Sequence, residues 1–219
     1  FSYNERLARE TRPFFVEGQG FLPQRQLFAT QRVRDMDAGF KLFGNAGRSQ
    51  LGFLGLVDGN RHRATAFDLD YKLTEEFRLG TSFAGRFDNT RDASAGMINA
   101  RYNKPGPSGS RYFFGNYSSL LAGGSDHAME TYVGFNPANR HLGYWAGYRY
   151  FGRDYRPVDG FVPERDVRRY AAGLEYENKM ASGPIDEWQI YAQADYAQHL
   201  DGSFFYGETT GELFLGLRN

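Results

Sequence analysis

Strict alternation of side-chain character is the feature that most constrains the fold of this chain. In residues 77–88, apolar or small side chains share one face, namely Phe77, Leu79, Thr81, Phe83, Gly85 and Phe87. Charged or small side chains share the other face, namely Arg78, Gly80, Ser82, Ala84, Arg86 and Asp88. Because successive side chains of a β-strand point to opposite sides, this period of two predicts a strand with one apolar face.

The same alternation recurs along most of the chain and predicts about 12 strands. They are 26–33, 37–44, 49–57, 63–73, 77–88, 94–103, 111–119, 128–135, 141–151, 168–177, 188–196 and 205–217. Each spans about 8–12 residues, the length that a tilted strand needs to cross a bilayer. We therefore expect an all-β fold, an antiparallel transmembrane β-barrel of about 12 strands or a part of a larger barrel.

Composition supports this fold and excludes several function classes. Aromatic residues make up 17% of the 219 residues and Gly occupies 27 positions, yet the mean hydropathy is −0.61. This combination fits strands whose alternate residues face lipid and a polar lumen, with aromatic rings at the membrane interfaces. Basic and acidic residues balance at 26 each, which argues against a nucleic-acid partner. Without Cys, disulfides, thiolate catalysis and iron–sulfur clusters are excluded.

A soluble β-sandwich would also alternate, with its apolar face turned inward. The alternative interpretation is therefore a soluble all-β carbohydrate-binding or glycan-hydrolysing domain. Strand length and the mixture of aromatic residues, Gly and Ala on the apolar face favour the membrane barrel. The longest connection, 152–166, belongs to the set that we place outside the membrane, because outer-membrane barrels have longer extracellular loops than periplasmic turns.

Residues 1–25 lack a sustained period, so we divide the chain into a lead-in or plug segment, 1–25, and a β-barrel, 26–219. Pro13 biases the residue before it toward an extended backbone, two Phe supply apolar area, and a Gly permits a sharp turn. We expect Arg12 and Glu17 to form a pair inside a polar lumen, and a structural role is favoured over a catalytic one. The candidate lumen or plug residues are Arg6, Arg12, Pro13, Phe14, Phe15, Glu17 and Gly18.

The stretch Asn4-Glu-Arg6 followed by Glu10-Thr-Arg-Pro-Phe-Phe-Val-Glu-Gly18 resembles a lead-in signature of a bacterial family of unassigned function. In that family the segment E-x-R-P-F-F-[LV]-E-G introduces a C-terminal outer-membrane β-barrel. A β-sandwich similar to family 9 carbohydrate-binding modules usually precedes it. Similarity continues to residue 57, although the family's aromatic–Ser–Arg–Arg stretch reads Ala29-Thr-Gln-Arg32 here.

This resemblance implies a location in the bacterial outer membrane, with the lipid bilayer as one partner and a glycan or envelope protein as another. Together with the strand pattern, it predicts a porin-like outer-membrane β-barrel protein of a Gram-negative cell envelope. The expected role is structural, transport or surface assembly, and an enzyme activity is the less favoured interpretation. Glycan handling would come through the preceding domain.

The connection 152–166 is the candidate ligand loop, through Asp154, Tyr155, Arg156, Asp159 and Glu164. Sugars are commonly held by carboxylates that bind their hydroxyls while an aromatic ring stacks beneath, but a solvated loop over the barrel mouth is favoured. The four His lack the spacing of zinc ligands, and the loop acids lack the spacing of an EF-hand. We therefore expect no metal and no cofactor, and we assign no catalytic residue.

Overall fold

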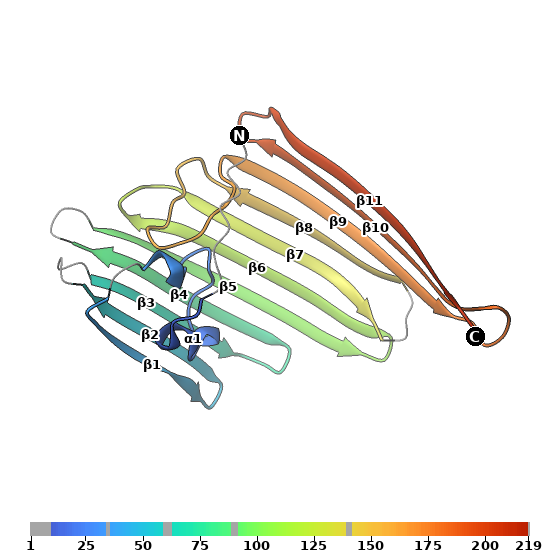
Figure 1. The fold of residues 1–219 in the computed structure, drawn as a ribbon, viewed down its shortest axis with the longest axis horizontal. Helices are drawn as coiled ribbons and strands as arrows, with labels where there is room; N and C mark the ends of the chain where they lie inside the picture. The colour runs from blue at the N-terminus through green and yellow to red at the C-terminus, as the bar shows by residue number, and fades with distance from the viewer. Residues whose placement is uncertain (1–9, 34–35, 59–62, 89–91, 139–141, 219) are drawn as a thin grey trace. The chain divides into compact units, whose positions relative to one another are not determined.

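The computed structural model describes residues 10–33, 36–58, 63–88, 92–138 and 142–218. In this part of the chain, 11 antiparallel strands form one sheet whose order follows the sequence (Figure 1). The strands are β1 (Ala38–Ala46), β2 (Ser49–Val57), β3 (Arg63–Lys72), β4 (Phe77–Phe87), β5 (Ala93–Gly106), β6 (Gly109–Ala122), β7 (His127–Pro137), β8 (Leu142–Phe151), β9 (Val167–Lys179), β10 (Ile185–His199) and β11 (Phe204–Leu217). The prediction of an all-β antiparallel fold is confirmed.

Three short helical turns precede the sheet, namely α1 (Pro13–Val16), η1 (Gln19–Phe21) and η2 (Thr30–Arg32). No helix in the described ranges is long and apolar enough to cross a membrane. β1 and β11 are the two ends of the strand order, so the pairing seen among these residues is that of an open sheet.

The strand predicted at 26–33 is wrong, and it accounts for the difference between the expected and observed strand numbers. The backbone there makes local bonds: the N–H groups of Leu27 and Phe28 both donate to the carbonyl of Gln24, and η2 follows. Its apolar residues are buried because the segment packs on the sheet. From here on we use the name lead-in for residues 10–33, where helical turns and local hydrogen bonds take the place of strand pairing.

Contacts between Cα atoms divide the chain into two compact units, which are described separately. The first unit consists of residues 1–99, 116–128 and 151–166. The second unit consists of residues 100–115, 129–150 and 167–219.

In the first unit, one sheet face carries the core. Its buried members are Phe15, Leu27, Phe28, Val33, Leu54, Leu56, Ala64, Ala66, Ala84, Ala95 and Met97. Strand register places Leu54, Ala66 and Ala84 side by side. The lead-in, whose helical turns lie over these strands in Figure 1, packs on these small and aliphatic side chains. Lys41 fastens it there, since its Nζ donates to the carbonyl oxygens of Phe14 and Glu17, each at 2.6 Å.

The opposite face of the first unit is apolar and exposed. Phe40 is 61% exposed, Ile98 63% and Leu121 62%. The predicted alternation thus separates two faces in this unit, with the small or polar face covered by the lead-in and the apolar face uncovered.

The second unit alternates in the same way. Its exposed large apolar side chains include Leu142, Tyr144, Tyr170, Leu174, Ile190, Tyr196, Leu213 and Leu215. In β9 and β10, Glu175 pairs in register with Tyr191, and Gly173 with Gln193, on the other face. This unit therefore also has one apolar and one polar sheet face.

Packing of the lead-in on β2 predicts the effect of a methyl group at Gly52. A Cβ at this position would lie 1.7 Å from the carbonyl oxygen of Phe21 in η1. We expect Gly52→Ala to displace the lead-in and to lower the free energy of unfolding by about 1–3 kcal/mol, the usual cost of overpacking. Urea unfolding measures the stability, and the rate of tryptic cleavage at the exposed Arg25 measures the displacement.

Gly55→Ala is the matched control on the opposite face of the same strand. A Cβ there would meet only the Phe53 ring, at 3.6 Å, which is an ordinary contact. Equal cleavage rates at Arg25 in the two variants would contradict the packing of η1 on Gly52.

Candidate functional site

Arg12 joins the two ends of the lead-in. Its Nε and Nη2 bind the two carboxylate oxygens of Glu10, at 2.9 and 2.8 Å. Its Nη1 donates to the carbonyl of Val33 at 2.6 Å, and Nη2 also donates to that of Thr30 at 2.7 Å. Because a guanidinium presents several donors in one plane, a single side chain closes this loop of the backbone.

The expected pair of Arg12 with Glu17 is wrong. Arg12 binds Glu10, whereas Glu17 lies 3.5 Å from Nζ of Lys41 on β1. The reason is local geometry. The α1 turn separates Glu17 from Arg12 and places it near Lys41, whereas Glu10 is only two residues from Arg12, whose backbone is extended. The hydrogen bond from Arg12 lowers the pKa of Glu10 from 4.5 to about 2.

The other lead-in candidates lie around this pair. Pro13 begins α1, the Phe15 ring lies 4.3 Å from the guanidinium carbon of Arg12, and Phe14 meets Phe15 edge to face. Gly18 has a φ of +69°, so the sharp turn expected there is present and requires a residue without a Cβ. Arg6 lies outside the described residues.

The candidate ligand loop folds onto the lead-in. Ala29 N–H donates to the carbonyl of Asp159 at 2.6 Å, and Phe161 N–H donates to that of Arg25 at 2.8 Å. Gly160 is required at this contact, because a Cβ there would lie 2.2 Å from the carbonyl oxygen of Gln26. The two segments, distant in sequence, therefore form one backbone-to-backbone junction within the first unit.

Tyr155 is fully buried at this junction, where a solvated loop was expected. Its hydroxyl donates to Oγ of Ser118 on β6 at 2.7 Å, and Nε2 of Gln26 donates to the same oxygen at 3.1 Å. The ring therefore serves the interior of the protein, and it is not exposed for stacking on a ligand.

Asp159 is also buried, with 1% of its surface exposed, and it forms an ion pair with Arg86 on β4. None of the described residues donates a hydrogen bond to its Oδ2. Burial raises the pKa of this carboxyl, while the nearby positive charges of Arg86 and Arg32 oppose that shift. Of the loop candidates, Asp159 thus anchors the loop to the sheet.

The remaining loop candidates lie nearer the surface, with Asp154 and Arg156 exposed and Glu164 half-buried. A hollow of about 280 Å³ beside the loop is lined by Arg32, Arg156 and Arg165 together with apolar loop residues. Asp154, Asp159 and Glu164 are not among the residues that line this hollow, and the charged side chains that line it are arginines.

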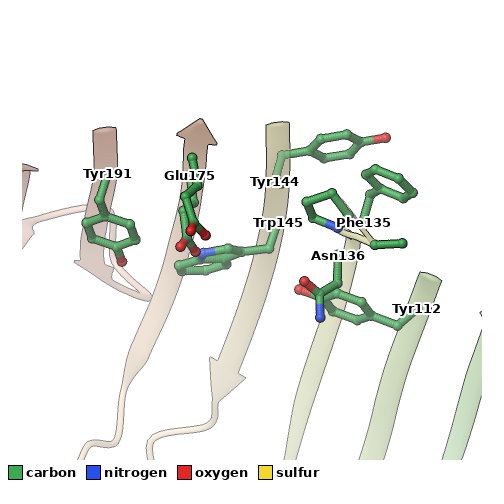
Figure 2. A pocket seen from close by; sticks show the side chains of 11 residues that line it. Tyr112, Phe135, Asn136, Tyr144, Trp145, Glu175 and Tyr191 are labelled. Atoms are coloured by element: carbon green, nitrogen blue, oxygen red, sulfur yellow. The ribbon is translucent and has the colours of Figure 1, made fainter. Parts of the chain in front are cut away.

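A second hollow, also of about 280 Å³, lies in the second unit, where the sequence indicated no site (Figure 2). It is lined by Tyr112, Phe135, Asn136, Pro137, Ala138, Gly143, Tyr144, Trp145, Glu175, Glu177 and Tyr191. Two carboxylates and several aromatic rings thus meet near the ends of β7 and β8. Among these lining residues, none is a lysine or an arginine.

Glycines of neighbouring strands position the rings of this face. A Cβ at Gly173 on β9 would lie 2.4 Å from Nε1 of Trp145, on β8. A Cβ at Gly134 would lie 2.4 Å from Cζ of Tyr112 in the same way. Each ring therefore lies over the backbone of the next strand, where any larger residue would collide with it. Part of this arrangement is visible in the sequence, because Gly143, Trp145 and Gly147 occupy alternate positions and so share one face of the predicted strand.

A metal site is not indicated: within the described ranges, no group of three or more His, Asp or Glu could hold an ion. The polar groups that do cluster are ion pairs. Arg169 on β9, for example, binds Asp195 on β10 through Nε, at 2.9 and 3.0 Å. These pairs satisfy charges on the polar face of the sheet.

The buried carboxylate of Asp159 predicts what holds the loop in place. Asp159→Asn removes the partner of Arg86, so we expect docking of the loop to weaken by about 1–3 kcal/mol, at the lower end for a partly buried pair. Faster tryptic cleavage after Arg165, a half-buried arginine of the same loop, would report the release. Asp154→Asn removes a charge of the same kind from an exposed position, and we expect it to leave the cleavage rate unchanged. Equal rates in the two variants would refute the anchoring role.

Glu10 predicts an acid-dependent release of the lead-in. Because its pKa in the folded protein, about 2, lies below the ordinary 4.5, its stabilising contribution is present above pH 4.5 and is lost as the pH falls toward 2. We expect Glu10→Gln to remove this part of the pH dependence. Since the chain has no Cys, a dye on Arg25→Cys can report release of the segment between pH 2 and 6.

Glu17→Gln removes an exposed carboxylate from the same segment and serves as the control. Its pH profile should match that of the unsubstituted protein. An unchanged profile in Glu10→Gln would show that another group controls the release.

Comparison of the chain with known protein families, curated proteins and solved structures gave no match. The similarity of the lead-in to the outer-membrane family therefore stays a prediction from the motif. Two physical features are left to indicate function, namely the exposed apolar face of the strands and the groups on the opposite face.

Proposed function

We propose that the chain is the membrane-embedded region of a bacterial outer-membrane β-barrel, with the lead-in as a plug on its polar side. The observation that carries this proposal is the exposed apolar face, which both units present on their strands. Its exposed members include Phe40, Leu42, Ile98, Leu121, Leu213 and Leu215. Large exposed apolar areas indicate contact with a partner or with lipid, and their even distribution over many strands favours lipid.

Aromatic rings on β9 and β10 support a bilayer as the partner. Tyr170 pairs in register with Tyr196 toward one end, and the rings of Tyr176 and Trp188 lie 5.0 Å apart toward the other. Between them lie aliphatic and small side chains such as Leu174. This order is typical of interfacial girdles that flank a lipid-facing band, because an amphipathic ring is favoured at the boundary between headgroups and hydrocarbon.

A bilayer also requires closure of the sheet. Unpaired N–H and C=O groups at a strand edge cost several kcal/mol each in hydrocarbon. Under this proposal β1 and β11 are paired in the membrane, either with one another or with further strands. The count of about 12 strands, or of a larger barrel containing these, belongs to the same proposal.

The lead-in supports a plugged barrel over an open pore. It covers the small and polar face of the first unit through the core of Phe15 and Leu54 and through the two bonds of Lys41. A transport or surface-assembly role then requires the lead-in to move, whereas a structural role does not. The proposed partners are the bilayer and a glycan or protein of the envelope.

A soluble carbohydrate-binding or hydrolytic domain is the alternative. The hollow with Trp145 and the two carboxylates favours contact with a carbohydrate. The apolar face argues against solubility, because a soluble sandwich would turn those side chains inward. We therefore keep the membrane assignment and attribute the hollow to the polar face of the same sheet.

The two tryptophans of the chain allow a direct test. Trp145 lies against Gly173 on the polar face of the second unit, and Trp188 lies against Tyr176 on the apolar face. Trp145→Phe leaves Trp188 on the apolar face, and Trp188→Phe leaves Trp145 on the polar face. In vesicles of brominated phosphatidylcholine, we expect strong quenching of Trp188 and weak quenching of Trp145. The physical reason is that bromine quenches only on close approach, which acyl chains achieve on the lipid-facing side alone.

The pair of variants also supplies its own control, because both proteins enter the same vesicles. Equal quenching of the two tryptophans would contradict the assignment of the faces. Recovery of the protein in the aqueous fraction, without association with vesicles, would contradict membrane insertion altogether.

A further inference from the structure

We infer that the hollow between the lead-in and the loop 152–166 is a binding site for a phosphate monoester, held by the guanidinium groups of Arg32, Arg156 and Arg165. An ester bound there joins the two segments. Arg32 and the loop both belong to the first unit, so the site lies within one compact body. The inference goes beyond the proposed function and does not depend on membrane insertion.

Arginines from two segments line this hollow, which has a volume of about 280 Å³. Arg32 belongs to η2 of the lead-in, whereas Arg156 and Arg165 belong to the loop. The volume is near the lower limit for small-molecule sites, which suits a phosphate group on a small carbon skeleton. The other described residues of the lining are Tyr155, Pro157, Val158, Gly160 and Val162.

Arg165 supplies the main evidence for a ligand. Its side chain is half-buried, and its Nη1 is buried without a hydrogen-bond acceptor among the described residues. A buried donor that lacks an acceptor is costly, so native proteins usually satisfy it with a water molecule or an ion. Because the same side chain lines the hollow, an anion there can accept this hydrogen bond.

The charges around the hollow favour an anion. Asp159, the buried carboxylate of the loop, already forms an ion pair with Arg86. Arg32 also acts on Asp159, since its positive charge opposes the rise in the pKa of that carboxyl. Part of the charge of Arg32 is therefore shared with Asp159, and Arg156 and Arg165 provide the larger part of the attraction.

The number of guanidinium groups indicates which anion fits. A guanidinium donates through a planar fork that matches the oxygens of a carboxylate or a phosphate. A carboxylate has two oxygens and one charge, whereas a phosphate monoester has three strong acceptor oxygens and nearly two charges at neutral pH. Donors that come from two segments therefore favour the phosphate, and the carbon skeleton of the ester can lie against Pro157, Val158 and Val162.

Binding at this position stabilises the docked lead-in. The ligand contacts Arg32 on one segment and the loop arginines on the other, so it binds well only while the segments are together. A ligand that binds one state alone changes the equilibrium by a factor of one plus the ratio of its concentration to Kd. At about ten times Kd, release of the lead-in should thus fall about tenfold.

Titration calorimetry of the protein in detergent with glycerol 3-phosphate is the direct test. We expect saturable binding with a Kd on the order of 1 mM. Glycerol carries the same skeleton without the phosphate, and acetate carries a carboxylate, so neither should bind measurably at the same ionic strength. No binding of glycerol 3-phosphate would overturn the site. Equal binding of acetate would overturn the assignment to a phosphate.

Variants test the arginines one at a time. Arg165→Gln and Arg156→Gln are each expected to weaken binding about tenfold, through loss of charge-assisted hydrogen bonds. Arg153→Gln is the matched control, because it removes the same charge from an exposed position of the same loop, beside Asp166. Its Kd should stay within about a factor of two. Equal weakening in all three variants would show general attraction of anions and would overturn the site.

A dye on Arg25→Cys tests the joining of the two segments. Glycerol 3-phosphate at about ten times Kd should raise the urea concentration at which the dye reports release, and Arg165→Gln should abolish this shift. Binding without any shift would overturn the joining of the segments. Circular dichroism confirms that each variant is folded, and Arg156 is exposed, so Arg156→Gln keeps the test open where Arg165→Gln unfolds.

A last titration identifies the source of the phosphate. Dihexanoyl phosphatidic acid, used below its micellar concentration, presents the same group on a lipid. Tighter binding than that of glycerol 3-phosphate would support a lipid headgroup, and equal or weaker binding would support a soluble ester. Failure of lipid quenching at Trp188 would leave these titrations unaffected, so the two proposals fail separately.

Discussion

The fold depends on one constraint, that alternate side chains of each strand meet two different environments. In the first unit Leu54 lies under the lead-in, whereas its neighbour on β2, Phe53, lies on the apolar face. A shift of one residue in the pairing would exchange these faces and bury the wrong set. The apolar face is the exposed one, so the buried area in this unit comes from small side chains and from a segment outside the sheet. The lead-in is therefore part of the core.

The lead-in and the loop 152–166 stabilise one another. Backbone N–H and C=O groups of each segment form hydrogen bonds with the other segment, and these groups would lose their partners if the segments separated. Asp159 loses water on burial and gains the ion pair with Arg86. Its backbone carbonyl and that of Arg25 accept the hydrogen bonds that join the two segments. The pKa of Asp159 is raised and that of Glu10 is lowered, because desolvation competes differently with hydrogen bonds and nearby positive charges at the two carboxyls. Desolvation dominates at Asp159, and hydrogen bonding from Arg12 dominates at Glu10. As the pH falls, the carboxyl of Asp159, whose pKa is raised, therefore takes up its proton before that of Glu10, whose pKa is lowered to about 2.

Alternation was sufficient to predict 11 of the strands, because a period of two leaves a local trace in sequence. It failed at 26–33, where residues such as Leu27 and Val33 are buried by tertiary packing and mimic a strand. The partners of Arg12 and Asp159 were not predictable, since each depends on backbone carried in from a distant segment. The loop acids were chosen for sugar chemistry by residue type alone. Of these acids Asp159 is buried and pairs with Arg86, and a loop sequence does not reveal which of its residues are buried.

The hollow in the second unit also depends on contacts between strands, which the sequence alone does not reveal. Trp145 and the glycines beside it were visible as an alternating polar face, but the Gly that seats the indole, Gly173, is on the next strand. Only cross-strand register brings such a pair together, and register depends on the whole sheet. The same arrangement recurs in this unit, where Gly134 lies beside the ring of Tyr112 and Gly147 beside that of Tyr132. Each of these rings covers the backbone that its glycine leaves bare, so a larger residue on one strand would displace the ring of the next.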